Sequence, residues 1–137
     1  MRIVLDTNVF ISAIFFSGPP AQILQSWKEK KFQIVLSQEI IEEYQRVAES
    51  LSEKYQALDI SPLLELLTIN GLIVETEGFE VSACDDPDDN KFIECALAGK
   101  SKIIVNGDKH RLKLSGFRTI KVHNPREFVD MYLKPGI

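Results

Sequence analysis

The sequence predicts an α/β fold, a three-layer doubly wound domain around a five-stranded parallel sheet. Five short apolar runs have the length and composition of buried strands. Segments with helical spacing of apolar residues separate these runs, and such alternation forms a parallel sheet through right-handed crossovers. The length of 137 residues suits one domain with a proper core and is too short for two. We therefore expect a single domain over residues 1–137.

The first predicted strand ends in a polar turn. Ile3, Val4 and Leu5 form an unbroken apolar run that stops at Asp6-Thr7-Asn8, after which apolar residues resume at helical spacing. A carboxylate at this position would lie at the edge of the sheet where α/β folds bind ligands. Asp6 or Thr7 could equally cap the next helix. This stretch by itself leaves both interpretations open.

Turn and cap residues place the remaining elements. Helices are expected to begin at or just after Pro20, Ser37, Ser61, Pro87 and Pro125, and the helix after Ser37 is expected to reach about Glu49. Further strands are expected at residues 32–36, 72–74, 102–105 and 118–122.

Charge is distributed unevenly along the chain, whose net charge is −4. Residues 1–37 carry four basic and two acidic side chains (net +2), residues 38–90 carry two and fourteen (net −12), and residues 91–137 carry ten and four (net +6). An acidic centre beside a basic C-terminal third suits a cation site next to a polyanion-binding surface. Solvated helix faces that differ in sign are the alternative explanation.

The sequence favours a cytoplasmic protein without a membrane segment. No apolar run approaches the roughly 18 residues of a membrane span, and no signal peptide is evident. Cys84 and Cys95 lack the spacing of metal ligands, so buried free thiols are expected.

Three separated acids are predicted to meet at one edge of the sheet. Asp6 follows the first strand, Asp108 follows the fourth, and Asp89 lies in the first turn of the helix that leads into the fourth strand. In a parallel α/β sheet, the carboxyl ends of the strands and the N-termini of the helices share one edge. Topology alone therefore brings these side chains together.

Glu43 is the acid of its helix that is best placed to face the same edge. At about 100° per residue, it lies roughly 95° from the centre of the apolar stripe, whereas Glu39, Glu42 and Glu49 lie roughly 135–165° away. A solvated position on the flank of the helix is the alternative for Glu43.

A group of carboxylates with no His or Cys partner predicts a Mg²⁺ or Mn²⁺ site rather than a zinc site. Crowded carboxylates repel one another unless a cation balances them. Mg²⁺ commonly binds carboxylates together with a substrate phosphate, which is typical of phosphodiester chemistry. The sequence shows no Ser/His/Asp or Cys/His nucleophile set and no GxxxxGK[ST] or GxGxxG loop. His110 and His123 are expected at the surface or against phosphate.

Four motifs occur in order at domain-scale spacing. They are LDTNVF at residues 5–10, LSQEIIEEY at 36–44, DPDDNKF at 86–92 followed by Ala96, and IVNGD at 104–108. With these motifs the chain resembles the PIN-domain nucleases over nearly its full length, and specifically the VapC-like toxins of toxin–antitoxin systems. Each motif is weak alone, but the four together are specific.

The resemblance implies a sheet of order 3-2-1-4-5 and a Mg²⁺- or Mn²⁺-dependent endoribonuclease. The acidic residues of the family fall on Asp6, Glu43, Asp89 and Asp108. The small polar residue beside the first acid, which helps to order the site, falls on Asn8.

One position departs from the family pattern. Thr or Ser is usual two residues before the last acid, where this chain has Asn106. Its amide can still hydrogen-bond a carboxylate or a phosphate, so activity is expected to survive. Asp86 is an accessory candidate, although a role as N-cap before Pro87 explains it fully.

The leading hypothesis is a ribonuclease in which three aspartates hold the ion and Glu43 completes the cage or positions water. Candidates for contacts with RNA phosphate follow the last aspartate, and a short solvated helix is their alternative explanation: Lys109, His110, Arg111 and Lys113. The resemblance also implies a small antitoxin protein as partner and a homodimer.

Two other classes of function are alternatives to the nuclease. A non-catalytic nucleic-acid-binding or regulatory PIN-like module would be favoured by loss of an acid, and all four acids are present. A phosphoryl-transfer enzyme with an aspartyl nucleophile usually has a second Asp two residues later, where this chain has Asn8.

Overall fold

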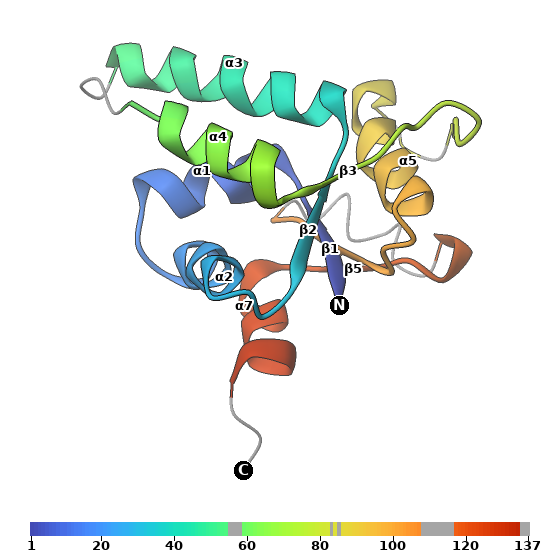
Figure 1. The fold of residues 1–137 in the computed structure, drawn as a ribbon. Helices are drawn as coiled ribbons and strands as arrows, with labels where there is room; N and C mark the ends of the chain where they lie inside the picture. Colours follow the sequence, from blue (N-terminus) through green and yellow to red (C-terminus); the bar gives the residue numbers. More distant parts are fainter. Residues whose placement is uncertain (55–58, 83, 85, 108–116, 135–137) are drawn as a thin grey trace.

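The computed structural model describes residues 1–54, 59–82, 84, 86–107 and 117–134. Its centre is a five-stranded, all-parallel sheet of order β3-β2-β1-β4-β5 (Figure 1). The strands are β1 Arg2–Leu5, β2 Gln33–Leu36, β3 Leu72–Ile73, β4 Ile103–Val105 and β5 Lys121–His123. The predicted fold class and strand order are therefore confirmed.

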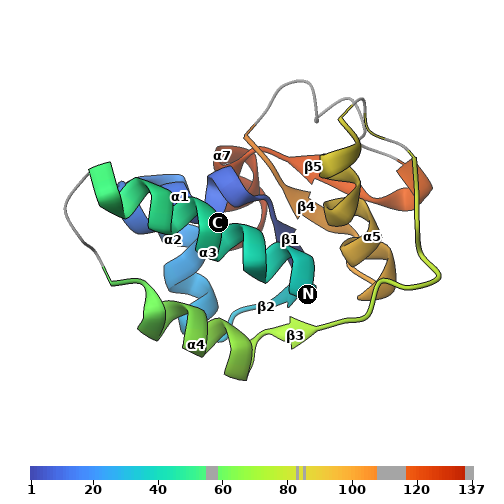
Figure 2. The ribbon, with the colours of Figure 1, turned by 90° about the horizontal axis from the view of Figure 1, so that it is seen from above.

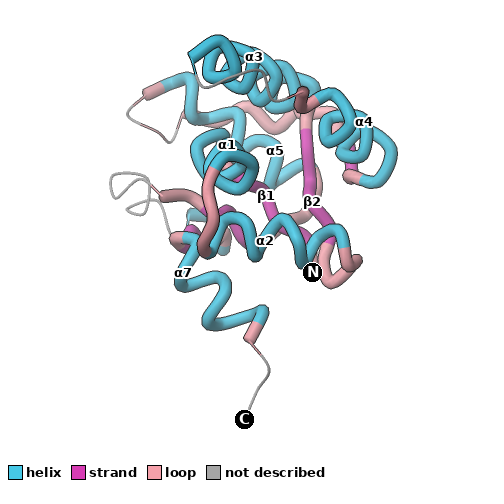
Figure 3. The backbone as a smooth tube through the Cα atoms, turned by 90° about the vertical axis from the view of Figure 1, so that its left-hand side faces the viewer, coloured by secondary structure: helices cyan, strands magenta, loops and turns pink. Residues whose placement is uncertain are grey.

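Helices cover both faces of the sheet. They are α1 Thr7–Phe15, α2 Pro19–Lys28, α3 Gln38–Lys54, α4 Ser61–Asn70, α5 Asn90–Ala98 and α7 Pro125–Phe128, with the 3₁₀ turns η1 Pro87–Asp89 and η2 Phe117–Thr119 and the π-helical turn η3 Val129–Leu133. Figure 2 shows α5 on one side of the strands and α1 and α2 on the other. Helix α5 contacts β1, β2 and β4, and α2 lies beside α7 (Figure 3).

The centre of the sheet is buried from both sides, which explains its continuous apolar runs. Ile3, Val4 and Leu5 of β1 are at most 1% exposed, and all three residues of β4 are buried. Strand β1 pairs with β2 through Ile3 and Ile34, and with β4 through Val4 and Ile104. The carboxyl ends of β1 and β4 therefore lie next to each other.

The largest differences from the predicted element boundaries lie at β5, α3 and α5. Strand β5 begins at Lys121 rather than at residue 118, because Arg118 and Thr119 have φ values of 46° and 68°, which a strand cannot adopt. Helix α3 continues to Lys54 rather than ending near Glu49. Pro87 begins the 3₁₀ turn η1, and α5 starts only at Asn90.

Neither Cys84 nor Cys95 forms a disulfide; Cys95 is fully buried and Cys84 is partly exposed. Within the described ranges, no helix is both long enough and apolar enough to cross a membrane.

Candidate active site

Asp6 lies at the carboxyl end of β1, where the chain turns into α1. Its side chain is 1% exposed, and one carboxylate oxygen accepts a hydrogen bond from the backbone N–H of Val9 at 2.9 Å. The interpretation of Asp6 as an N-cap is therefore confirmed. Because a carboxylate offers about four acceptor sites, capping is compatible with a second role as a ligand.

A cavity of about 200 Å³ opens beside Asp6 at this edge of the sheet. It is lined by Asp6, Thr7, Asn8, Glu43, Val47, Asp86, Asp88, Asp89 and Phe92. We call it the acidic cavity. It brings together Asp6, Glu43 and Asp89 of the predicted acids, with Asn8 and Asp86 as accessory residues. A larger cavity of about 540 Å³ around Trp27 and Phe32 contains none of the predicted site residues.

Glu43 faces the acidic cavity because the next residue ties α3 to β1. The Tyr44 hydroxyl donates a hydrogen bond to the backbone carbonyl of Leu5, and its ring stacks on Phe10 with 4.1 Å between centroids. Burial, together with the nearby charge of Asp6, raises the pKa of Tyr44 well above its usual value, so the hydroxyl keeps the proton that it donates. Glu43 is 8% exposed, which confirms that it reaches inward.

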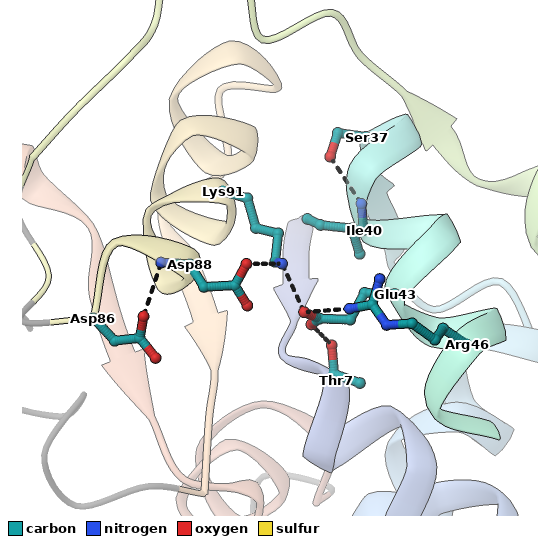
Figure 4. A network of polar contacts seen from close by, with 8 residues as sticks. All are labelled: Thr7, Ser37, Ile40, Glu43, Arg46, Asp86, Asp88 and Lys91. Atoms are coloured by element: carbon teal, nitrogen blue, oxygen red, sulfur yellow. Dashed lines mark hydrogen bonds and ion pairs between the residues drawn. The ribbon is translucent and has the colours of Figure 1, made fainter. Parts of the chain in front are cut away.

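Both carboxylate oxygens of Glu43 contact protein donors (Figure 4). The Thr7 hydroxyl donates to Oε2, whereas Lys91 Nζ lies 2.6 Å and Arg46 Nη2 lies 3.6 Å from Oε1. The Lys91 ammonium also donates to Asp88 Oδ1 at 3.0 Å. It therefore bridges two acids of the cavity, one from α3 and one from η1.

These contacts hold Lys91 and Asp88 in their charged forms. Burial opposes the charge of Lys91, but hydrogen bonds and charge interactions with Glu43 and Asp88 outweigh it and raise the pKa of Lys91. The same hydrogen bond lowers the pKa of Asp88. Lys91 is only 8% exposed and is thus a buried cation in contact with two residues that line the acidic cavity, Glu43 and Asp88.

The turn before α5 places two further predicted acids. The side chain of Asp86 accepts a hydrogen bond from the backbone N–H of Asp88 at 3.0 Å, so Asp86 is the expected N-cap and also lines the cavity. Asp89 is the last residue before α5, and it lines a second, small cavity together with Asn106. Asn106 is 3% exposed just after β4, and its backbone N–H donates to the carbonyl of His123 at 2.9 Å.

The last predicted acid lies outside the described residues. Asp108 and the predicted RNA-contact residues all lie outside the part of the chain that the structure describes: Lys109, His110, Arg111 and Lys113.

The donor set of the acidic cavity fits a hard divalent cation. Its nine lining residues supply carboxylate, hydroxyl and amide oxygens and include no His or Cys, which is the chemistry that Mg²⁺ and Mn²⁺ prefer. Across the described parts of the chain, no three His, Cys, Asp or Glu side chains form a group that could enclose an ion. Mg²⁺ usually takes one or two protein carboxylates and fills its remaining positions with water and substrate phosphate. The described carboxylates meet that requirement.

The sequence does not predict the roles of two lining residues, Thr7 as a partner of Glu43 and Asp88, or of Lys91, which contacts Glu43 and Asp88. For Lys91 a signal exists. It lies four residues before the buried Cys95, so it falls on the apolar stripe of α5, and it follows the acidic Asp88 by three residues. A lysine on a buried stripe indicates a partner of opposite charge.

The expectation that His123 lies at the surface is wrong. His123 is 8% exposed at the end of β5, with Nδ1 3.4 Å from Glu127 Oε2 and its ring against Tyr132. The turn into α7 and η3 covers it. Its Nε2 atom has no hydrogen-bond partner among the described residues.

Comparisons with known proteins agree with this geometry. The PIN domain family model matches residues 2–110. The uncharacterized protein MJ1680 of Methanocaldococcus jannaschii is 32% identical over 147 residues, covering 98% of this chain and 93% of that protein.

A solved structure shares the fold. The crystal structure of VapBC2 from Rickettsia felis bound to a DNA fragment from their promoter contains a chain similar to this one, with a TM-score of 0.63 and 16% sequence identity. The similarity covers 90% of this chain and 98% of that chain. PIN domains are generally nucleases and typically use divalent metal ions. The match to the family model spans most of the sequence, and the chain therefore belongs to the PIN domain family.

Proposed function

We propose that this protein is a Mg²⁺- or Mn²⁺-dependent endoribonuclease and the toxin component of a toxin–antitoxin pair. One observation carries the proposal: Asp6, Glu43 and Asp89 come from three separate elements and line one cavity at the carboxyl edge of the sheet. Capping, ion pairing and helix propensity do not by themselves require acids from three elements to share a cavity.

In this proposal Asp6 and Asp89, together with Asp108, hold the divalent ion. When bound, the ion makes a water molecule more acidic and stabilises charge on the scissile phosphate. Asp6 is held in place by its hydrogen bond from Val9, and Glu43 is held at the cavity wall by Thr7 and Lys91. A fixed geometry of this kind lets the residues orient water and phosphate before the reaction begins.

The accessory residues act around these acids. Asn8 and Asp86 line the acidic cavity, and Asn106 lies beside Asp89, where its amide can bind a carboxylate or a phosphate oxygen. The basic residues after Asp108 are proposed to contact RNA phosphates: Lys109, His110, Arg111 and Lys113. With a net charge of −4, the protein is expected to bind RNA weakly and in a salt-sensitive way.

Family membership, and the fold shared with a chain of the VapBC2 complex, support the proposed role as the toxin of a toxin–antitoxin pair. The expected partners are a small antitoxin protein and a second copy of the chain, and the expected location is the cytoplasm. The substrate is RNA.

Cleavage of a labelled RNA panel with Mg²⁺, Mn²⁺ or EDTA tests the proposal. The native protein is compared with Asp6→Asn and Asp89→Asn, each checked for folding by circular dichroism. Asp130→Asn is the matched control, because Asp130 is an exposed acid on the C-terminal turn η3.

Metal-dependent cleavage that both cavity variants lose and the control keeps would support the proposal. If folded native protein cuts no RNA but binds it without metal, the non-catalytic PIN-like module becomes the better account.

A further inference from the structure

Lys91 is a lysine that the proposed chemistry does not use. Its side chain is 9% exposed and comes from the first turn of α5, next to two residues that line the acidic cavity. Burying an ammonium group is costly unless ion pairs and hydrogen bonds compensate it. Lys91 has both, with Glu43 Oε1 at 2.6 Å and Asp88 Oδ1 at 3.0 Å.

Glu43 is correspondingly occupied by the protein itself. Thr7 donates to one of its oxygens, and Lys91 and Arg46 approach the other. Coordinating a metal ion through Oε1 would require Glu43 to exchange a charged contact of 2.6 Å for the ion. It would also leave the ammonium of Lys91 buried with one acidic partner fewer.

We propose that Lys91 is the built-in counter-ion of Glu43, a carboxylate that lines the acidic cavity: it neutralises Glu43 and keeps that carboxylate out of the metal's ligand set. This inference rests on the proposed function, because it assumes a divalent ion among the aspartates. It assigns Glu43 and Lys91 as a positioning pair, and among the described acids it leaves Asp6 and Asp89 as the direct protein ligands. Lys91 thereby reduces the repulsion among the acids before any metal binds.

The test is a double-mutant cycle of Mn²⁺ affinity, measured by isothermal titration calorimetry and by electron paramagnetic resonance of free Mn²⁺. The full-length variants are Glu43→Gln, Lys91→Met and the double variant. Glu43→Gln removes one of the two acidic partners of Lys91 and so leaves an excess of positive charge beside the aspartates, and Mn²⁺ binding is expected to weaken about tenfold or more. Replacing Lys91 by Met as well removes that charge, and the double variant is expected to return to within about threefold of native affinity.

Two further variants control for general effects of charge and folding. Glu43→Gln combined with Lys28→Met removes an exposed lysine on α2 instead, and it is expected to stay as weak as Glu43→Gln. Lys91→Arg keeps the positive charge and is expected to bind Mn²⁺ within about threefold of native. Thermal unfolding in EDTA shows that each variant is folded before metal is added.

The outcomes separate this inference from the proposed function. If the double variant binds Mn²⁺ as weakly as Glu43→Gln, then Glu43 is itself a ligand and the role assigned to Lys91 is overturned. If native protein binds Mn²⁺ no better than Asp6→Asn and Asp89→Asn, the proposed metal site fails, and the inference fails with it. Recovery in the double variant with native binding intact supports both.

Discussion

The Tyr44 hydroxyl donates a hydrogen bond to the backbone carbonyl of Leu5, and this contact joins the middle of α3 to the last residue of β1. Each of these two residues is adjacent in sequence to a predicted site acid: Glu43 precedes Tyr44, and Asp6 follows Leu5. One buried hydrogen bond therefore sets the distance between two predicted site acids that are far apart in the chain.

Replacing Tyr44 by Phe should lower both stability and RNA cleavage. The Leu5 carbonyl would lose its side-chain donor in a buried position, and the free energy of unfolding is expected to fall by about 1–2 kcal/mol. Urea unfolding followed by Trp27 fluorescence measures this loss, with the more exposed Tyr132→Phe as control. Undiminished cleavage in a destabilised Tyr44→Phe protein would show that Glu43 keeps its place without this bond.

Two substitutions of Asp6 should distinguish its role as a helix cap from its proposed role in cleavage. Asn is as good an N-cap as Asp, so Asp6→Asn is expected to leave the unfolding free energy within about 0.5 kcal/mol of native. Asp6→Ala removes the acceptor for Val9 and is expected to cost about 1 kcal/mol. Cleavage assays on both should show the same near-complete loss, because each removes the charge. Activity retained by Asp6→Asn would leave Asp6 as a cap only.

Gly99 should tolerate no side chain. A Cβ at this position would lie 2.3 Å from Val35 Cγ1 and 3.2 Å from the carbonyl oxygen of Cys95. Gly99→Ala is therefore expected to lower the unfolding free energy by about 2 kcal/mol through overpacking between α5 and β2. Gly107→Ala is the control, since a Cβ there meets no described atom within 4 Å. Equal midpoints in urea for the two variants would contradict this.

The thiol of Cys95 should not react with thiol reagents while the protein is folded. Burial raises the pKa of its thiol to about 12, so the reactive thiolate is almost absent at pH 8. A colorimetric thiol reagent is expected to modify Cys84 first and Cys95 only after unfolding. Rapid reaction of both thiols under native conditions would disprove the prediction.

The same thiol should make stability depend on pH in the alkaline range. The unfolded thiol ionises near pH 8.5, whereas the folded thiol keeps its proton until about pH 12. Above about pH 8.5 the unfolded state therefore binds fewer protons, and stability falls as the pH rises, by up to about 1.4 kcal/mol per pH unit. Cys95→Ala removes this contribution, and its unfolding free energy should decline less steeply between pH 9 and 11.

The strands of the sheet and the inward direction of Glu43 could be predicted from the sequence. Apolar runs such as Ile3–Leu5 have one physical explanation, burial on both faces, so the strands could be predicted. The inward direction of Glu43 followed from its angle to the apolar stripe of α3. Arg118 and Thr119 carry no glycine-like signal for their positive φ values, so the late start of β5 could not be foreseen.

The ion pair between Glu43 and Lys91 shows what sequence patterns leave out. Its members belong to α3 and α5, and each is charged in a segment where charge normally indicates solvent. Only the packing of two helices over the end of β1 makes them partners. The burial of His123 beneath Tyr132 has the same origin.

The order of the strands also means that the surroundings of Asp6 can form only after β4 has been synthesised. In the chain β1 precedes the other four strands of the sheet, yet it lies between β2 and β4, and the backbone N–H of Asp6 donates to the carbonyl of Val105 at 3.1 Å. A growing chain must therefore reach β4 before Asp6 acquires this neighbour, and pairings so distant in sequence form slowly. Incomplete chains from interrupted translation would lack this arrangement at the edge of the sheet.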